Sequence, residues 1–313
     1  MKKLLALLLC AALAVSFGAC AKTPVPAPSA ESSTAAPEST APPTEETAAE
    51  PSYFWDVNAE WDYFHGLLSE YQTKSVMELL EEAFTNGCFD RWGTSGDPSD
   101  YSIWGLVRLS EEYPVLRFLL GWQHAIQEIR ENGPALVEKY LAMDEPPVGL
   151  RGLADTIYLI FCPDMQYPEA LYALPQPQAN EEKQADLWGQ ETERDVFAEI
   201  AAQYVQYSDI ELLEMAFYEG AFKEWGVSSA FESYGIWGLV RRAEQCPPLK
   251  ALLGRQSAVM SIREYGPALV ERLAALDAAG ELDDVPILSM WGISDSVYLI
   301  FCPDLPRPKD RYL

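Results

Sequence analysis

A cysteine followed by proline and aspartate occurs twice in the chain, each time in the heptapeptide Tyr-Leu-Ile-Phe-Cys-Pro-Asp, which contains Cys162 in one copy and Cys302 in the other. A cysteine is a nucleophile when its pKa is lowered, and two cysteines can form a disulfide when their Cα atoms lie within about 6 Å. The chain has only two histidines, His65 and His124, and neither recurs in the second copy. A Cys–His pair therefore cannot be made twice. Free buried thiols are the favoured interpretation, and a Cys162–Cys302 disulfide is the alternative.

Carboxylates also recur at matched positions, and two of them facing each other across a cleft could act as general acid and base in glycoside cleavage. The recurring pairs are Glu111 with Glu244, Glu131 with Glu264, Asp155 with Asp295, and Asp164 with Asp304. Capping, ion pairing and solvation explain the same residues, so no catalytic residue is assigned and a hydrolase is the least favoured function. No spacing such as CxxC or HExxH occurs. We therefore expect no metal and no other cofactor.

Aromatic and cationic residues at matched positions are the candidates for ligand binding. Trp92 and Trp225 each follow a predicted helix and stand beside a glycine, so their rings could line a groove for a sugar or peptide, or cover the edge of the core. Arg108 and Arg241 follow an apolar stretch. Each could clamp a ligand carboxylate or form an internal ion pair. Core packing and ion pairing are the favoured alternatives for these four residues.

An internal repeat organises the chain that must position these residues. At an offset of 133 residues, segment 78–138 aligns with segment 211–271 without a gap, and more than half of the 61 positions are identical. Farther along the chain an insertion of seven residues shifts the offset to 140. We therefore predict two tandem copies of one unit of about 100 residues. The predicted boundaries are unit 1 at 53–165, a linker at 166–193, unit 2 at 194–305 and a tail at 306–313.

The periodicity within each unit is helical, which predicts an all-α fold. Ser75 and Ser208 are each followed three residues later by glutamate, the pattern of a capping box at a helix start. The helices that they open should end at Gly87 and Gly220. No strand, glycine-rich loop and helix follow one another as in nucleotide-binding folds.

Two further segments make sharper predictions about where helices end. Segment 115–132 is predicted as one helix that ends at Gly133, and Pro134 is predicted to begin the next helix, because glycine suits a helix end and proline a first turn. The Tyr-Leu-Ile-Phe stretches are predicted as helix, with a buried strand as the alternative. Either element should end at the cysteine, because the residue before a proline disfavours the helical conformation.

The first twenty residues, MKKLLALLLCAALAVSFGAC, have the layout of a secretory signal, with two lysines, an apolar run and small residues before Cys20. The Phe-Gly-Ala-Cys ending resembles the lipobox of bacterial lipoprotein precursors. That resemblance covers the precursor segment alone, and it implies removal of residues 1–19 and linkage of Cys20 to diacylglycerol. It also implies an exported protein that is anchored by lipid to the bacterial membrane and faces away from the cytoplasm.

Residues 20–52 then consist of almost nothing but Ala, Pro, Ser, Thr and Glu after the cysteine. Such a composition cannot bury enough apolar surface to fold, so we predict a disordered, extended tether. Removing Lys2 and Lys3 with the signal leaves 20 basic against 48 acidic residues, a net charge of −28. Nucleic acid is therefore excluded as a partner, because the phosphate backbone is itself negative.

Together these features predict an envelope lipoprotein whose duplicated helical part is a binding module for an extracytoplasmic protein or peptide, and not an enzyme. A carbohydrate-binding module that uses the loop tryptophans is the alternative. The membrane is reached through the lipid on Cys20, and the identity of the protein, peptide or glycan partner is unknown.

Overall fold

The computed structural model describes residues 57–92, 101–174, 191–223, 225, 235–282 and 285–308. Within these residues the chain forms twelve α-helices and no strand, so the predicted all-α class is confirmed. All of them belong to one compact unit at residues 51–313. The signal, Cys20 and the tether lie outside the described residues, as does most of the predicted linker. No described helix is both long and apolar enough to cross a membrane.

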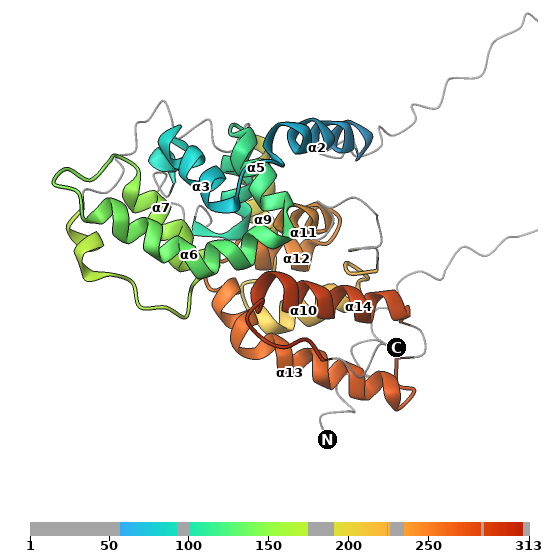
Figure 1. Cartoon of the computed structure of the whole chain (residues 1–313). Coiled ribbons are helices and arrows are strands. Elements are labelled where there is room, and N and C mark those ends of the chain that lie inside the picture. Colours follow the sequence, from blue (N-terminus) through green and yellow to red (C-terminus); the bar gives the residue numbers. More distant parts are fainter. Residues whose placement is uncertain are drawn as a thin grey trace, which may run out of the picture. The chain divides into compact units, whose positions relative to one another are not determined.

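We call residues 57–174 the first half and residues 191–308 the second half (Figure 1). The helices of the first half are α2 (Val57–Tyr71), α3 (Val76–Thr85), η1 (Cys88–Arg91), α4 (Ile103–Ser110), α5 (Pro114–Gly121), α6 (Gln123–Leu141), α7 (Leu150–Thr156), the π-helix η3 (Ile157–Phe161) and η4 (Glu169–Ala173). Those of the second half are α9 (Glu191–Gln203), α10 (Asp209–Tyr218), α11 (Ile236–Ala243), α12 (Pro247–Leu253), α13 (Ala258–Ala278), α14 (Ile287–Ser296) and the π-helix η6 (Val297–Phe301).

The predicted capping boxes are present at the starts of α3 and α10. The hydroxyls of Ser75 and Ser208 each accept a hydrogen bond from the backbone N–H three residues on, and the glutamate there accepts one from the serine N–H. Past the other ends of these helices, Gly87 and Gly220 adopt left-handed conformations with φ of 76° and 81°. The helices therefore begin and end as their local sequences predict.

The prediction that a helix ends at Gly133 is wrong. Helix α6 runs through Gly133 and Pro134, and α13 runs through Gly266 and Pro267. Gly133 instead allows close packing, because a Cβ there would lie 3.2 Å from the side chain of Ile157 in η3, closer than such atoms usually approach. The predicted 115–132 helix is in turn divided between α5 and α6, where Trp122 has an extended backbone.

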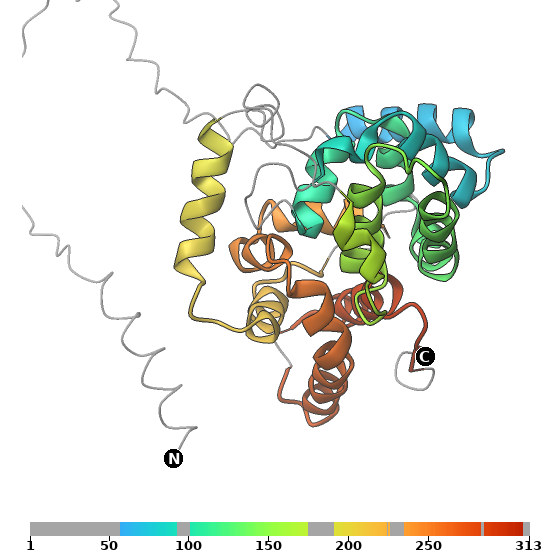
Figure 2. The same ribbon diagram turned by 90° about the vertical axis from the view of Figure 1, so that its left-hand side faces the viewer.

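The two halves pack through reciprocal aromatic contacts. Phe64 of the first half meets Trp237 of the second at 5.8 Å between ring centroids, and Phe197 of the second half stacks on Trp104 of the first at 5.9 Å. Helix α11 accordingly packs against α4 and α5, and α9, the yellow helix in Figure 2, packs against α12. All four rings are buried, so this contact belongs to the core of the unit.

A cation covers each of the buried tryptophans in this contact. The guanidinium of Arg117 lies 4.2 Å from the ring centroid of Trp237, and Nζ of Lys250 lies 4.5 Å from that of Trp104. Such contacts strengthen when they are removed from water. Arg117 and Lys250 occupy matched positions of the sequence repeat, so each half places a cation on a ring of the other.

Candidate functional site

The cysteine of each heptapeptide completes the hydrogen bonding of a helix that contains a proline. Pro134 has no N–H to donate to the carbonyl of Arg130, four residues earlier in α6. The thiol of Cys162 donates to that carbonyl oxygen, with 3.3 Å between sulfur and oxygen. In the second half Pro267 likewise leaves the carbonyl of Arg263 without a backbone donor. The thiol of Cys302 donates to that oxygen, with 3.7 Å between sulfur and oxygen.

The heptapeptides are helical and not strands, as predicted, but their last turn is wider than an α-helix. The N–H of Cys162 donates to the carbonyl of Ile157, five residues back, at 2.7 Å, and Cys302 repeats the bond to Val297 at 2.8 Å. Each π-helix packs on the proline-containing helix of its own half. This wide turn places the thiol and the aspartate that follow it against that helix.

The aspartates that follow these cysteines meet two arginines in one ion cluster, which we call the Arg–Asp cluster. Arg130 donates to both carboxylate oxygens of Asp164, at 2.7 and 2.6 Å, and Arg263 donates to both of Asp304, at 2.9 and 3.1 Å. The pairs are also crossed, with Arg130 lying 3.3 Å from Asp304 and Arg263 lying 3.5 Å from Asp164. The cluster therefore joins the two halves of the chain.

The cluster keeps both carboxylates ionised. Hydrogen bonds from Arg130 lower the pKa of Asp164, and those from Arg263 lower the pKa of Asp304. A general acid at neutral pH needs a raised pKa, so this pair has the opposite electrostatics. The arrangement of these four groups is that of a structural contact between the halves.

Cys162 and Cys302 are free and buried, so the structure contains thiols at these positions and not the alternative disulfide. Burial raises the pKa of each thiol to about 11. A thiol with such a pKa is almost entirely protonated at neutral pH and is a poor nucleophile. Both cysteines act as small packed residues that donate one hydrogen bond.

Apolar side chains are exposed beside the Arg–Asp cluster. Met165 directly follows Asp164 and is 45% exposed, and Leu305 directly follows Asp304 and is 41% exposed. Met260 is also exposed and lies one turn from Arg263 on α13, on the same helix face. We call the surface formed by Met165, Leu305, Met260 and the half-exposed carboxylates of Asp164 and Asp304 the junction surface.

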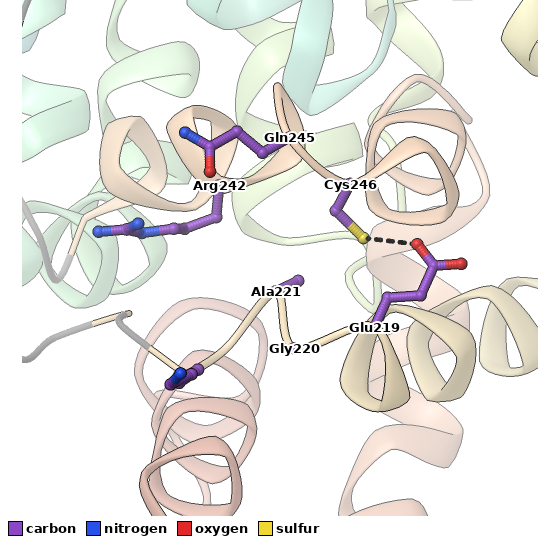
Figure 3. Close-up of a pocket in the computed structure, with 7 residues that line it drawn as sticks. Glu219, Gly220, Ala221, Arg242, Gln245 and Cys246 are labelled. Carbon is purple, nitrogen blue, oxygen red and sulfur yellow. Dashed lines mark hydrogen bonds between the residues drawn. The ribbon is translucent and has the colours of Figure 1, made fainter. Parts of the chain in front are cut away.

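A pocket of about 140 Å³ lies in the second half, between the end of α10 and the end of α11. In Figure 3 the segment that carries Arg242, Gln245 and Cys246 faces the segment that carries Glu219, Gly220 and Ala221. Lys223 also lines the pocket.

The thiol of Cys246 is not a nucleophile in this pocket. Burial raises its pKa to about 12, and the sulfur lies 3.7 Å from the Oε2 of Glu219, to which it donates (Figure 3). The pocket therefore presents a protonated thiol and charged groups at its rim, a set suited to binding.

The tryptophans predicted to line a groove are buried. Trp92 is 2% exposed and meets Tyr101 edge to face at 6.2 Å, and Trp225 is 3% exposed. Neither ring is a platform on which a sugar could stack, so these positions give no support to carbohydrate binding. Among the described tryptophans the exposed ring is that of Trp291, which the sequence comparison did not single out because arginine occupies the matched position of the first half.

Arg108 and Arg241, the arginines predicted as candidate ligand contacts, lie in different environments. Arg108 is buried and pairs with Glu111 at 2.9 Å, which is the internal ion pair that was the alternative to a ligand clamp. Arg241 is half-buried. Neither lines the pocket, in which Arg242 takes part instead.

The other carboxylates singled out in the sequence are also occupied by the protein itself. Burial raises the pKa of Asp155, which accepts a hydrogen bond from the Tyr167 hydroxyl at 2.5 Å. Asp295, at the matched position of the second half, pairs with Arg307. Within the described residues, no three histidine, cysteine or acidic side chains converge in the manner of metal ligands.

The pocket was missed because each of its residues is unremarkable by itself. Alignment of the chain with itself at an offset of 133 residues contained a usable signal, since Lys223 and Arg242 stand where the first half has Asp90 and Leu109. Comparison of the chain with models of protein families, with curated proteins and with solved structures finds no match.

Proposed function

We propose that the protein is a lipid-anchored envelope protein whose helical part binds another extracytoplasmic protein or peptide through the junction surface. The observation that carries this proposal is the set of exposed apolar side chains, Met165 and Leu305, contributed by both halves next to the ionised carboxylates of the Arg–Asp cluster. Apolar side chains flanked by negative charge suit a segment that carries apolar residues next to basic ones.

The proposal includes a fused pair of helical units as the architecture. Support comes from the sequence identity at an offset of 133 residues and from matched features, such as the two capping boxes and the two proline-containing helices. In such a pair the aromatic contacts and the Arg–Asp cluster would lie about a pseudo-twofold axis. The junction surface would then be a composite of the two units.

Photo-crosslinking in the producing cells tests the binding surface. A benzophenone amino acid in place of Met165 should give a discrete covalent adduct with a second protein, because a residue in a contact lies within reach of its partner. The matched control is Met143, which is 43% exposed and lies outside the junction surface. Leu305→Asp should weaken the adduct at position 165. The same adducts at both positions, or none at position 165, would refute this surface.

A second experiment tests the lipid anchor separately. Cys20→Ser removes the sulfur that would carry diacylglycerol, so the protein should move from the membrane pellet to the soluble or precursor fraction. Cys10→Ser is the matched control, because it alters a cysteine within the signal and leaves Cys20 in place. An unchanged distribution of the Cys20→Ser protein would contradict anchoring at Cys20.

A further inference from the structure

We propose that the pocket of the second half is a binding site for a phenol that carries an anionic group, such as a small phenolic acid. None of the pocket residues belongs to the junction surface, so the proposal is independent of the partner protein. It is drawn from what the first half places in the same position.

The backbone has similar dihedral angles at two pairs of matched positions beside the pocket. Tyr113 is the residue matched to Cys246, and their φ,ψ values are −127°, 94° and −134°, 95°. The facing glycines, Gly87 and Gly220, both have positive φ, 76° and 81°. We call these two backbone positions, the glycine and the residue that faces it, the frame, and the two halves place different side chains on it.

In the first half the frame is filled by a phenol. The side chain of Tyr113 crosses from the start of α5 to the end of α3, where its hydroxyl donates to the carbonyl oxygen of Gly87 at 3.4 Å. Cysteine is shorter than tyrosine and carries no ring. The second half consequently has an open pocket between the segments that Tyr113 bridges in the first half.

The hydrogen-bond acceptor for the phenol hydroxyl is retained in the second half. The carbonyl oxygen of Gly87 accepts two hydrogen bonds, one from Tyr113 and one from the N–H of Asp90. The oxygen of Gly220 accepts one from the N–H of Lys223 at 3.1 Å, and no described residue donates the second. A carbonyl has two lone pairs, so a bound phenol can take the position of the Tyr113 hydroxyl.

The charge around the frame changes from negative to positive between the halves. Lys223 replaces Asp90, Arg242 replaces Leu109, and glutamine at 245 replaces glutamate. Among the described residues of the pocket lining, Glu219 carries a carboxylate, and Lys223 and Arg242 are cations. In a chain with a net charge of −26, a lysine in place of an aspartate at this pocket favours an anionic substituent on the ligand.

Titration calorimetry of the full chain with 4-hydroxyphenylacetate tests the site. Saturable binding is expected, and phenylacetate, which lacks the hydroxyl, should bind about 2- to 10-fold more weakly through loss of one hydrogen bond. Cys246→Tyr refills the frame and should abolish binding while the variant stays folded. Lys223→Asp should weaken 4-hydroxyphenylacetate but not the neutral phenol p-cresol. Absence of saturable binding, or equal binding to Cys246→Tyr, would overturn the proposal.

A gain of binding in the first half provides a second test that does not depend on a loss. Tyr113→Cys should open an equivalent cavity, so p-cresol should raise the thermal midpoint of this variant more than that of the unaltered chain, as expected for a ligand of the folded state. A peptide that ends in tyrosine, added to the unaltered chain, distinguishes a side chain of a polypeptide from a free phenolic acid as the natural source. Equal p-cresol shifts in Tyr113→Cys and the unaltered chain would contradict the phenol-shaped frame.

Discussion

Replacing Cys162 by alanine tests whether a thiol satisfies the carbonyl that Pro134 leaves without a donor. The buried Cys162 donates to the carbonyl of Arg130 at 3.3 Å. Loss of a neutral hydrogen bond costs about 0.5–1.5 kcal/mol, and a buried carbonyl left without a partner costs about 1–3 kcal/mol. Because S–H is a weak donor, we expect Cys162→Ala to lower the free energy of unfolding by about 1–2 kcal/mol.

A double-mutant cycle with Pro134→Ala isolates the hydrogen bond from the loss of packing. Alanine at 134 supplies the N–H that the carbonyl of Arg130 lacks, so Cys162→Ala should cost about 1 kcal/mol less in this background. The assay is urea unfolding followed by far-ultraviolet circular dichroism. The slope of the unfolding free energy against urea concentration should be the same in all variants, so that the midpoints report stability. Cys88→Ala is the matched control, because Cys88 is free and fully buried but not placed next to a proline-freed carbonyl.

The outcome of the cycle decides between two explanations of the repeated cysteine. A coupling energy near 1 kcal/mol for Cys162, with additive effects for Cys88, identifies the thiol as the partner of the freed carbonyl. Additive effects within about 0.3–0.5 kcal/mol for both cysteines would refute that role and leave packing as the only contribution of Cys162.

Three further predictions follow from the described contacts. The thiols of Cys88, Cys162, Cys246 and Cys302 should be inert to a disulfide reagent at pH 8 in the folded protein and react in denaturant. Burial raises the pKa of Cys162 and Cys302 to about 11 and that of Cys246 to about 12, and it raises the pKa of Cys88 well above its usual value. Asp164 and Asp304 have lowered pKa values in the folded state, so their contribution is complete above the unfolded value near 3.8 and is lost as the pH falls through the folded values. Asp164→Asn should therefore flatten the loss of stability measured between about pH 5 and pH 2, and an unchanged slope would contradict the cluster. Phe64→Ala and Phe197→Ala should each cost about 3–5 kcal/mol in urea unfolding, because each ring packs on a buried tryptophan of the other half; a small cost for either would contradict the reciprocal contact.

The features that could be predicted from the sequence are those decided within a few residues. The serine and the glutamate three residues later make the capping box among themselves, so the starts of α3 and α10 follow from local sequence. The Gly-Pro motif gave the wrong result because its meaning is set by a distant segment. Gly133 lacks a side chain at the point where Ile157 packs on the helix. The carbonyl of Arg130, which Pro134 leaves without a backbone donor, accepts a hydrogen bond from Cys162.

The candidate site shows the same division between local and distant causes. A buried tryptophan and a tryptophan in a groove have the same local sequence, so the burial of Trp92 could not be decided from residues alone. The partners of the Arg130 side chain come from both halves, and the nearest in sequence, the carbonyl oxygen of Phe161, is 31 residues away. The recurrence of Asp164 and Asp304 could be seen in the sequence, whereas their convergence on one cluster depends on how the two halves pack.

The residues that join the two halves are nearly the same in each half, whereas the residues of the pocket differ. Each half contributes one phenylalanine and one tryptophan to the aromatic contact, and one arginine and one aspartate to the ion cluster. A change in any of these would disturb a contact made by both halves. Tyr113 and Cys246 stand outside these shared contacts, so the difference between tyrosine and cysteine at this position leaves the aromatic contact and the ion cluster unchanged. A ligand that occupies the pocket of the second half would therefore leave the contacts between the halves undisturbed.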